Sequence, residues 1–276
     1  MGVRRQDVAV TLCYLLGFSR LKQLVSRLRR DMLTRFITFH DTPPEALPVF
    51  AANLEFLKHH TNVVSFDDFM AGRLSDSLLN IVLTFDDGYR SWVTGALPIL
   101  NRLKLPATFF ICSGFVGIDR PAQLEFMRQR LHLSPTSSEL VSGLTPVDIR
   151  RLADAGFTIG GHSVSHAKLP ALTSEEHVMR EIAEDRMRLQ SMAGCSIDYF
   201  AYPFGACLHP HIDLARFVRE AGYRAAVTTS SGANTATTDR FLLHRELALA
   251  EMPQWVFRAR ATGNYDAVQR LKALLS

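Results

Sequence analysis

Residues 81–88 of the chain read IVLTFDDG, an apolar run that ends in two adjacent carboxylates and a glycine. A short apolar run of this kind is typical of a buried strand. Neighbouring carboxylates repel each other, and each is costly to bury unless it shares a cation or a proton. Gly88 permits the chain to turn at the strand end, so Asp86 and Asp87 can serve one site. Taken alone, the stretch fits a solvated Asp-Asp-Gly turn equally well.

Further candidate strands, rich in β-branched or aromatic residues, lie on both sides of this one. They are residues 36–40, 62–65, 107–112, 158–161, 199–202, 225–228 and 240–248. Amphipathic segments separate them, and strands that alternate with helices predict a parallel sheet. This many units predicts a (β/α) barrel, in which the chemistry collects at the C-terminal ends of the strands.

Three helices between the strands begin at recognisable signals. One opens with Pro43 and Pro44 and runs to about residue 59. A second, over residues 145–155, has a threonine N-cap with proline at the first helical position, and a glycine ends it. The third begins with a capping box between Thr173 and Glu176 and runs to about residue 193. Residues 117–145 are polar and partly helical, which indicates a lid or decoration rather than a second domain.

A pair of histidines follows the predicted strand 158–161, where residues 162–166 read HSVSH. Histidines four apart fall on one side of a helical turn, a spacing that can clamp one metal. An isolated HxxxH is usually a pair of surface or capping histidines, but a carboxylate pair at another strand end reverses that balance. Two imidazoles and one carboxylate leave an open position, as in catalytic zinc sites, where the pKa of a bound water falls to about 7. The second carboxylate can then take the proton as the water attacks.

A third constellation, FAYPFG at residues 200–205, also ends a predicted strand. Pro203 and Gly205 set a stiff turn that can aim the backbone N–H of Phe204 into the site, as an oxyanion donor should be aimed. Without the other motifs it would be an aromatic turn and nothing more.

Over about residues 36–252 the chain resembles the polysaccharide deacetylases with the NodB homology domain, carbohydrate esterase family 4. The family's T-F-D-D-G motif stands intact at residues 84–88 and its H-S/T-x-x-H motif at residues 162–166. Its R-x-P-Y motif reads AYPF at residues 201–204, similar to the branch with F-A-Y-P-Y/F-G. The resemblance implies a deformed parallel (β/α) barrel of the NodB-homology type. It also implies that Asp86 is the catalytic base, and that Asp87, His162 and His166 bind one divalent metal ion, expected to be Zn²⁺.

Two departures from the family pattern concern the same part of the site. The arginine that commonly orients the base carboxylate is Ala201 here. The later L-x-H motif, which carries the general acid, matches residues 242–244. Because Arg245 follows it directly, the motif alone does not fix which of the two side chains faces the site. In a strand, His244 and Arg245 point to opposite faces. We expect His244 to be the general acid; in the alternative, Arg245 faces the site and replaces the missing arginine. For either residue, the purely structural alternative is a contact with a neighbouring helix on the outer face of the barrel.

Other residues at strand ends are expected to contact the substrate or to support the ligands. His40 and Asp41 end the first predicted strand and would face the mouth of the barrel, although Asp41 could equally cap the next helix. Tyr202 and Pro203 belong to the third motif.

The predicted reaction is metal-dependent hydrolysis of a C–N bond other than a peptide bond. Its substrate would be the acetamido group of an N-acetylhexosamine residue in a glycan, a polysaccharide or a glycolipid-linked sugar. One alternative keeps the metal site and changes the substrate to an O-acetyl ester, a formamide or a small amide. Another is a non-catalytic glycan-binding barrel, which the intact Asp86 argues against and the missing arginine favours.

The positive charge of the chain is concentrated at its N-terminus. Residues 1–36 carry eight basic and two acidic side chains, a net charge of +6, so the other 240 residues carry −2 of the total of +4. No basic stripe interleaved with aromatics occurs in the body, which argues against nucleic-acid binding. The apolar run 8–18 is too short to span a bilayer, and residues 19–30 after it are basic and amphipathic, without a cleavage site. This helix either lies on an anionic membrane surface or packs on the barrel.

We therefore divide the chain into a basic amphipathic helical segment (1–35), a deacetylase-like barrel (36–262) and a C-terminal helical tail (263–276). The four cysteines form no CxxC pair, and their wide spacing resembles neither a zinc cluster nor a disulfide framework. Cys112 is expected to be a small buried hydrophobe. We expect a reduced, cytoplasmic protein, with the N-terminal helix as a candidate contact to the inner face of the membrane.

Overall fold

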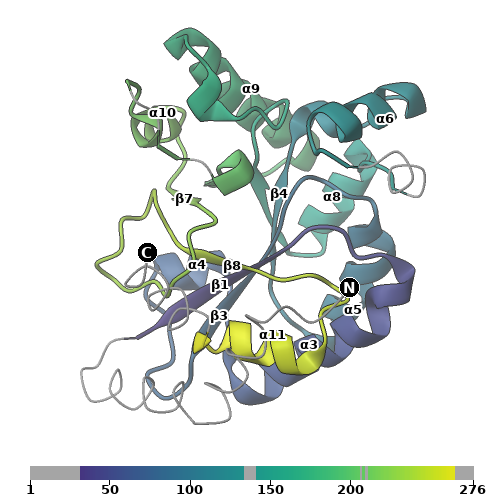
Figure 1. Cartoon of the computed structure of the whole chain (residues 1–276), viewed down its shortest axis with the longest axis vertical. Helices are drawn as coiled ribbons and strands as arrows, with labels where there is room; N and C mark the ends of the chain where they lie inside the picture. Colours follow the sequence, from purple (N-terminus) through teal and green to yellow (C-terminus); the bar gives the residue numbers. More distant parts are fainter. Residues whose placement is uncertain (1–31, 134–140, 206, 209–210, 265–276) are drawn as a thin grey trace, which may run out of the picture.

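Parallel strands surrounded by helices make up the part of the chain that the computed structural model describes, residues 32–133, 141–205, 207–208 and 211–264 (Figure 1). The strands are β1 (Thr34–Phe39), β2 (Asn62–Val63), β3 (Asn80–Phe85), β4 (Thr108–Ile111), β5 (Thr158–Gly161), β6 (Tyr199–Ala201), β7 (Ala225–Val227) and β8 (Arg245–Leu247). Their order in the sheet is β7-β6-β5-β4-β3-β1-β8, with β2 paired to the start of β3. All these pairings are parallel, as the alternation of strands and helices predicted.

The residues just before β8 close the sheet against β7. Val227 and Leu243 form an isolated parallel bridge, in which the N–H of Thr228 donates to the Leu243 carbonyl (2.8 Å) and the N–H of Leu243 to that of Ala226 (3.0 Å). The sheet is therefore a nearly closed barrel. The predicted last strand, residues 240–248, is correctly placed but too long, because only residues 245–247 pair as a strand.

Side chains along the strands alternate between the barrel interior and the layer beneath the helices. Phe36, Val82 and Phe110 belong to an interior cluster together with small residues of β6 and β7. Phe39 and Phe109 belong to a larger core outside the barrel, against the helices. Because parallel neighbours share this alternation in register, every strand presents its inner positions to the same enclosed space.

Helices cover the outside of the barrel (Figure 1). They are α3 (Leu47–His60), α5 (Leu97–Leu103), α6 (Arg120–Gln129), α8 (Pro146–Asp154), α9 (Glu175–Ala193), α10 (Leu214–Glu220) and α11 (Gln254–Ala261). The short helix α4 (Phe66–Met70) instead packs Phe66 and Phe69 against the interior cluster. Thr145 caps α8 in a capping box with Asp148, so the predicted start of this helix is confirmed. The predicted capping box at Thr173 is wrong by one residue, because the side chain of Ser174 accepts the N–H of His177 at the start of α9.

The boundaries of the barrel differ slightly from those drawn from the sequence. The basic N-terminal helix falls on residues 1–31, which lie outside the described residues, as do residues 265–276 of the predicted tail. Arg35, counted with the basic N-terminal segment, belongs to β1; it is buried and lies 3.6 Å from Glu246. None of the helices in the described ranges has both the length and the hydropathy to cross a membrane.

Candidate active site

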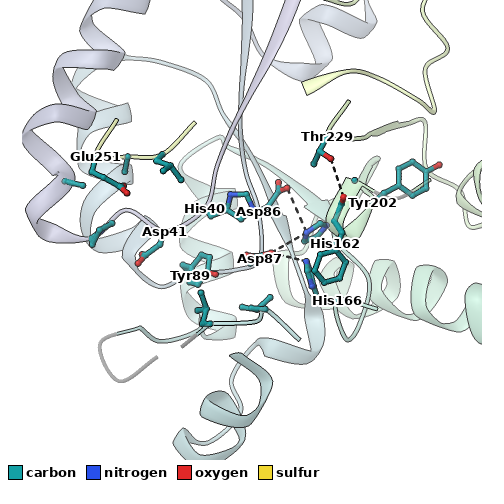
Figure 2. Close-up of a pocket in the computed structure, with 18 of the residues that line it drawn as sticks. His40, Asp41, Asp86, Asp87, Tyr89, His162, His166, Tyr202, Thr229 and Glu251 are labelled. Carbon is teal, nitrogen blue, oxygen red and sulfur yellow. Dashed lines mark hydrogen bonds and ion pairs between the residues drawn. The ribbon is translucent and has the colours of Figure 1, made fainter. Parts of the chain in front are cut away.

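Side chains from the C-terminal ends of four strands line one pocket of about 560 Å³ (Figure 2). The polar and aromatic groups that matter here are His40 after β1, Asp86 and Asp87 after β3, His162 and His166 after β5, and Phe204 after β6. The pocket therefore brings together the three sequence motifs at the end of the barrel where their strands converge.

The Asp-Asp-Gly turn places both carboxylates in the pocket. Gly88 adopts a positive φ of 109°, and Asp87 before it also adopts a positive φ, of 88°. The turn therefore contains a non-glycine residue in a conformation that favours glycine. The N–H of Asp86 still donates to the Phe39 carbonyl (2.9 Å), which keeps it in line with the strand. Both aspartates are buried. The turn thus directs two neighbouring carboxylates, which would alternate in a continuing strand, into one space.

The HSVSH segment is a loop and not the helical turn assumed from its spacing. Ser163 (φ 61°) and His166 (φ 52°) adopt left-handed conformations that a helix excludes. The two rings nevertheless converge, because the Nε2 atoms of His162 and His166 each lie 3.4 Å from Oδ1 of Asp87. The prediction of a helical turn was wrong. The two histidine rings nevertheless both approach Oδ1 of Asp87.

Backbone carbonyls orient both imidazoles. Nδ1 of His162 donates to the carbonyl of Ala201 (2.7 Å), and Nδ1 of His166 donates to the carbonyl of Arg130 (2.9 Å), just beyond the C-terminus of α6. A proton on Nδ1 leaves the lone pair on Nε2, which is the atom that faces Asp87. Metal-binding histidines are commonly held in this way by a partner on their other nitrogen.

Two edges of the resulting donor set match those of a tetrahedral metal site. Bonds of about 2.0–2.1 Å in a tetrahedral site place neighbouring ligand atoms about 3.3 Å apart, and both Nε2–Oδ1 separations here are 3.4 Å. Asp87 is buried, and no Lys or Arg among the described residues forms an ion pair with it. A buried carboxylate without a cationic partner is costly. Asp87, His162 and His166 are therefore the residues that could hold a metal.

The charges at this centre favour neutral His166 and ionised Asp87. Burial alone would raise the pKa of Asp87, but the hydrogen bond from His162 and the nearby histidine charges hold it well below its usual range. Burial, with the charge of His162, lowers the pKa of His166 to about 4. Burial would lower the pKa of His162 too, yet the hydrogen bond with Asp87 and the charge of Asp86 raise it. Without a cation, His162 is thus the group that carries the compensating proton.

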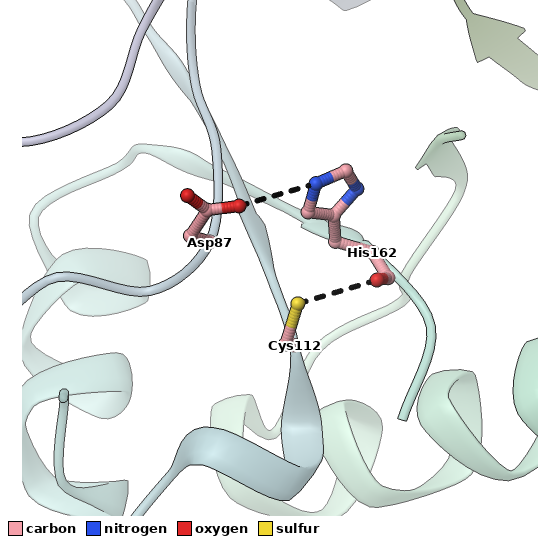
Figure 3. A group of neighbouring side chains, drawn as sticks. All are labelled: Asp87, Cys112 and His162. Carbon is pink, nitrogen blue, oxygen red and sulfur yellow. Dashed lines mark hydrogen bonds and ion pairs between the residues drawn. The ribbon is translucent and has the colours of Figure 1, made fainter. Parts of the chain in front are cut away.

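Cys112 offers a fourth donor beside this set (Figure 3). Its Sγ lies within 4.8 Å of donor atoms of Asp87 and His162. The thiol, however, donates to the carbonyl of His162 (3.3 Å), and burial raises its pKa well above the usual value. Distance alone groups Cys112, and not His166, with Asp87 and His162. Because the thiolate is the metal-binding form of cysteine, the raised pKa of the Cys112 thiol favours His166 as the third donor. The described cysteines, Cys112, Cys195 and Cys207, form no disulfide with one another.

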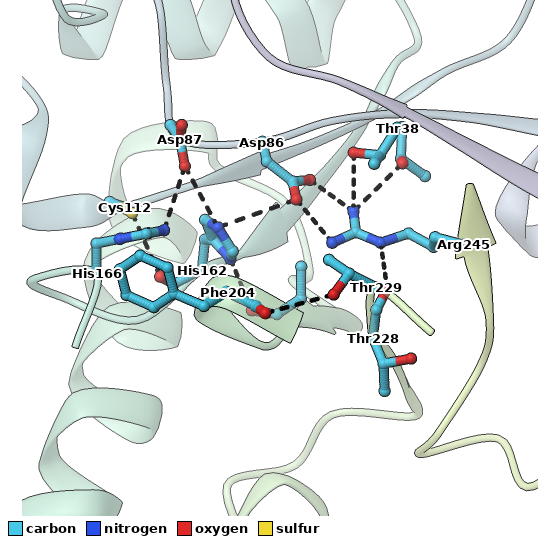
Figure 4. Close-up of polar contacts among 12 residues, drawn as sticks. Thr38, Asp86, Asp87, Cys112, His162, His166, Phe204, Thr228, Thr229 and Arg245 are labelled. Carbon is cyan, nitrogen blue, oxygen red and sulfur yellow. Dashed lines mark hydrogen bonds and ion pairs between the residues drawn. The ribbon is translucent and has the colours of Figure 1, made fainter. Parts of the chain in front are cut away.

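Arg245 supplies the cation beside Asp86 (Figure 4). Its Nη1 and Nη2 donate to Oδ1 and Oδ2 of Asp86, both at 2.7 Å, in a fork-to-fork pair. The same guanidinium donates to Thr38 Oγ1 (3.1 Å) and, through Nε, to the carbonyl of Thr228 (2.8 Å). Burial would raise the pKa of Asp86, but the charge and hydrogen bonds of Arg245 together with the charge of His162 outweigh it and lower the pKa. Asp86 is therefore held ionised and in a single orientation.

The register of β8 explains why the arginine enters the barrel. Arg245 pairs with Phe36 of β1, an interior position, and its guanidinium lies 5.6 Å from the ring centroid of Phe110. Ala201 belongs to the same interior cluster, so the small side chain on β6 leaves space that the arginine on β8 occupies. The arginine missing from the third motif is thus replaced from the last strand, which was the alternative arrangement considered from the sequence.

His244 lies outside the pocket, which corrects the expectation that it is the general acid. Its N–H donates to Asn234 Oδ1 (2.8 Å) and its carbonyl accepts Asn234 Nδ2 (2.9 Å). Its ring lies against Gly232, where an added Cβ would come within 3.1 Å of it. Neighbouring side chains alternate along the chain here, and Arg245 already takes the inward position, so His244 is directed away from the carboxylates.

A sequence model of the family described as "Polysaccharide deacetylase" matches residues 78–226, just over half of the chain. The chain belongs to this family. The match contains the Asp-Asp pair, the histidine loop and the third motif. His40, which lines the pocket, and Arg245, which pairs with Asp86, lie outside it, so in this member of the polysaccharide deacetylase family part of the site comes from beyond the matched range.

Two curated proteins are similar over part of their length. YxkH of Bacillus subtilis (strain 168) is 25% identical over 165 residues, which cover 60% of this chain and 50% of YxkH. The chitooligosaccharide deacetylase of Rhizobium leguminosarum bv. trifolii is 35% identical over 106 residues, 38% of this chain and 37% of that protein. The chain thus spans half or less of the length of each of these relatives.

Solved structures share the fold. IcaB from Ammonifex degensii superposes with a TM-score of 0.67 at 21% identity, covering 84% of this chain and 97% of IcaB. The Streptococcus pyogenes deacetylase PplD, in complex with acetate, superposes with a TM-score of 0.65 at 18% identity, covering 84% and 99%. At these identities the likeness shows the fold, the NodB-type (β/α) barrel that the resemblance implied.

The third motif forms a tight turn at the rim of this family member's pocket. Phe204 adopts a φ of 58°, and the N–H of Gly205 donates to the Tyr202 carbonyl (2.8 Å). The half-exposed Phe204 ring meets the edge of His166, with centroids 4.5 Å apart. Tyr202 lines the pocket, whereas Pro203 is buried behind it. The turn thus places an apolar ring beside the candidate metal centre.

His40 stands at the opposite wall, at the end of β1. Its carbonyl accepts the indole N–H of Trp92 (2.7 Å), which holds the strand end, and its ring lines the pocket near Asp86 (Figure 2). Its positive charge, when protonated, lowers the pKa of Asp86 and of Asp87. Asp41 beside it accepts the Ser91 hydroxyl (2.6 Å), and burial raises its pKa. His40 is therefore an imidazole of the pocket that is not part of the Asp87 donor set.

Two acidic residues of α9, which the sequence analysis did not single out, hold the histidine loop from behind. Glu181 accepts the N–H and the hydroxyl of Ser165 (2.9 and 2.8 Å). Asp185 accepts the N–H of His162 (2.8 Å) and that of Ser113 (2.9 Å). Burial raises the pKa of Asp185 to about 7, although these donors pull it down. Their only sequence signal is that both acids lie, four residues apart, on the buried stripe of an amphipathic helix.

Proposed function

We propose that the chain is a metal-dependent hydrolase that removes N-acetyl groups from N-acetylhexosamine residues of a glycan. The observation that carries this is the pairing of two buried aspartates with different partners: Asp87 with two imidazoles, and Asp86 with Arg245. A divalent cation held by Asp87, His162 and His166, with Zn²⁺ the best fit to this donor set, would polarise the acetyl carbonyl and lower the pKa of water. The similarity to a chitooligosaccharide deacetylase supports the substrate class.

Asp86 is placed to be the general base. Its Oδ2 lies 4.0 Å from Nε2 of His162, next to the donor set but not in it. Each of its oxygens accepts one N–H of Arg245 and keeps a free lone pair for the proton of an attacking water. Arg245 itself does not deprotonate in proteins. It orients the base, as the arginine of the third motif does in the family. The FAYPFG stretch at residues 200–205 supports placing the chain in the F-A-Y-P-Y/F-G branch.

The rim of the pocket offers a donor for the oxyanion. Phe204 adopts a left-handed conformation and lines the pocket beside His166. The backbone N–H of Phe204 donates to no acceptor among the described residues. A fixed backbone N–H that needs no reorganisation stabilises the developing charge of a tetrahedral intermediate. We assign this role to Phe204, as the sequence suggested.

His40 takes the place of His244 as the proton donor for the leaving amine. It lines the pocket beside Asp86, and imidazole is the commonest group for proton transfer in enzymes. His40→Ala is therefore expected to lower kcat about 10²–10⁴-fold while the metal content stays at the wild-type level. His244→Ala is the matched control and should leave kcat within a few-fold. Steady-state kinetics with metal analysis distinguishes them; a large loss in His244→Ala with wild-type rates in His40→Ala would reverse the assignment.

The activity itself is tested by acetate release from N-acetylated oligosaccharides, with and without a chelator. The same screen includes O-acetyl esters, formamides and small amides, because the metal centre alone does not select among them. Glycan binding without release from any substrate would favour a non-catalytic glycan-binding barrel. The buried Asp86–Arg245 pair argues against that alternative, since a binding barrel has no need of an ionised base at its centre.

We further propose a cytoplasmic location with weak contact to the inner face of the membrane through basic residues 20–30, which lie outside the described residues. Clustered arginines attract anionic lipids, and the attraction is screened by salt. The full chain is expected to co-sediment with anionic vesicles at low salt and to be released at high salt. Replacing Arg27, Arg29 and Arg30 by glutamine should abolish the co-sedimentation. Lack of binding by the wild-type chain at low salt would leave packing on the barrel as the role of this segment.

A further inference from the structure

Two buried carboxylates on α9 have no part in the reaction described above. Glu181 and Asp185 are 8% and 0% exposed, one helical turn apart, on the face of α9 that packs against β5. Neither forms an ion pair with a Lys or Arg among the described residues. Their side chains accept four hydrogen bonds, three from the loop of residues 162–166 and one from Ser113. Buried carboxylates used in this way need an explanation beyond packing.

We infer that Glu181 and Asp185 are positioning residues that hold the histidine loop in the conformation in which both Nε2 atoms converge on Asp87. This inference rests on the proposed metal site. Asp185 fixes the backbone at His162, where the loop leaves β5. Glu181 fixes it at Ser165, directly before His166. The two carboxylates therefore act at the two ligand-bearing ends of the loop.

The loop needs such support because its own conformation is unfavourable. Ser163 and His166 both have positive φ, which costs free energy for residues other than glycine. The N–H of His162 is shared between the Ile111 carbonyl of β4 (3.1 Å) and Asp185 of α9 (2.8 Å). Beyond it the strand pairing ends, and α9 accepts the next two N–H groups: that of Val164 by the Glu181 carbonyl (3.1 Å) and that of Ser165 by the Glu181 side chain. The helix thus compensates for the hydrogen bonds that regular structure would have supplied.

The chemistry of the donors predicts how each acid responds to amide substitution. Both groups that donate to Asp185 are backbone N–H groups, so two acceptor oxygens are required and asparagine offers only one. Glu181 receives one N–H and one hydroxyl. A hydroxyl can accept as well as donate, so glutamine at this position can keep both bonds. The inference therefore predicts opposite outcomes for two nominally similar substitutions.

The test measures the affinity of the full chain for Zn²⁺, by competition with a chromogenic chelator. Asp185→Asn and Glu181→Ala are expected to weaken binding about 10–100-fold, the usual effect of removing groups that orient metal ligands. Glu181→Gln should stay within a few-fold of wild type. Glu184→Gln is the matched control on the same helix, because Glu184 pairs with Arg188 at the surface, and it should bind like wild type.

A second readout separates positioning from stability. The visible spectrum of the Co²⁺-loaded protein reports ligand geometry, and it should change in Asp185→Asn and Glu181→Ala but not in Glu181→Gln. Thermal unfolding of the metal-free variants shows whether the fold is kept; Glu181→Ala carries the test if Asp185→Asn does not fold.

The outcomes distinguish this inference from the proposed function. Wild-type protein that binds no Zn²⁺ would overturn both. Wild-type protein that binds, with His162→Ala that does not, and with Glu181→Ala and Asp185→Asn at wild-type affinity and spectrum, would overturn the inference alone. A loss in Glu181→Gln as large as that in Glu181→Ala would also overturn it, because the hydrogen bonds would then not be what matters.

Discussion

Asp87→Asn is expected to lose bound metal and activity together, whereas Asp86→Asn should keep the metal and lose most of its activity. Asp87 is the carboxylate that lies 3.4 Å from both histidine Nε2 atoms, and an amide there replaces an anionic ligand by a neutral one. Asp86 pairs with Arg245 and lies beside the donor set, so its loss removes the base. Removal of a general base typically costs about 10²–10⁴-fold in rate.

Metal analysis of the purified variants and their kcat on an N-acetylated oligosaccharide check this pair of expectations. His162→Ala should resemble Asp87→Asn, because it removes another donor of the same set. Loss of metal in Asp86→Asn with retention in Asp87→Asn would reverse the roles. Equal metal content in wild type and His162→Ala would remove the proposed metal centre altogether.

Arg245→Met should be nearly as damaging, because it leaves Asp86 buried without its cation. Breaking a buried ion pair by removing one partner typically costs about 3–5 kcal/mol of folding stability. The pKa of Asp86 is lowered in the wild type by Arg245 against the effect of burial, so its removal raises that pKa. The base must be ionised to accept a proton. The acid limb of the pH–kcat profile is therefore expected to move to higher pH, with activity lost as pH falls through the raised pKa.

Two further variants isolate the cause. Arg245→Lys keeps the charge but not the fork, and should lower kcat with a smaller shift of the pH profile. The double variant Asp86→Asn with Arg245→Met removes both charges, so it should recover part of the stability lost in Arg245→Met and none of the activity. An unchanged pH profile and stability in Arg245→Met would show that the arginine neither holds nor ionises Asp86.

The barrel and the principal residues of its pocket could be predicted from local patterns. Short apolar runs alternating with capped helices indicated parallel strands, and the C-terminal ends of parallel strands meet at one edge of a barrel. Asp86, Asp87 and His162 follow such a run directly and His166 lies four residues further on, so chain position alone placed them together. The prediction needed no knowledge of the contacts, because strand direction and strand end are both properties of the local sequence.

The local conformation at the motifs was harder to predict. The spacing of His162 and His166 suggested a helical turn, but the residues form a loop with two positive φ angles. Side chains four residues apart can converge through more than one backbone path. The path taken depends on partners distant in sequence: the carbonyls of Arg130 and Ala201 and the two carboxylates of α9.

The sequence by itself determined the fold, the edge of the barrel that holds the pocket, and the fact that His244 and Arg245 face opposite ways. Only the tertiary structure decided which of the two enters. Neighbouring side chains of a strand point to opposite faces, but this alternation does not tell which of the two faces is the inner one. That choice follows from the pairing of Arg245 with Phe36 on β1, and from the buried Asp86 carboxylate that only a cation inside the barrel can neutralise.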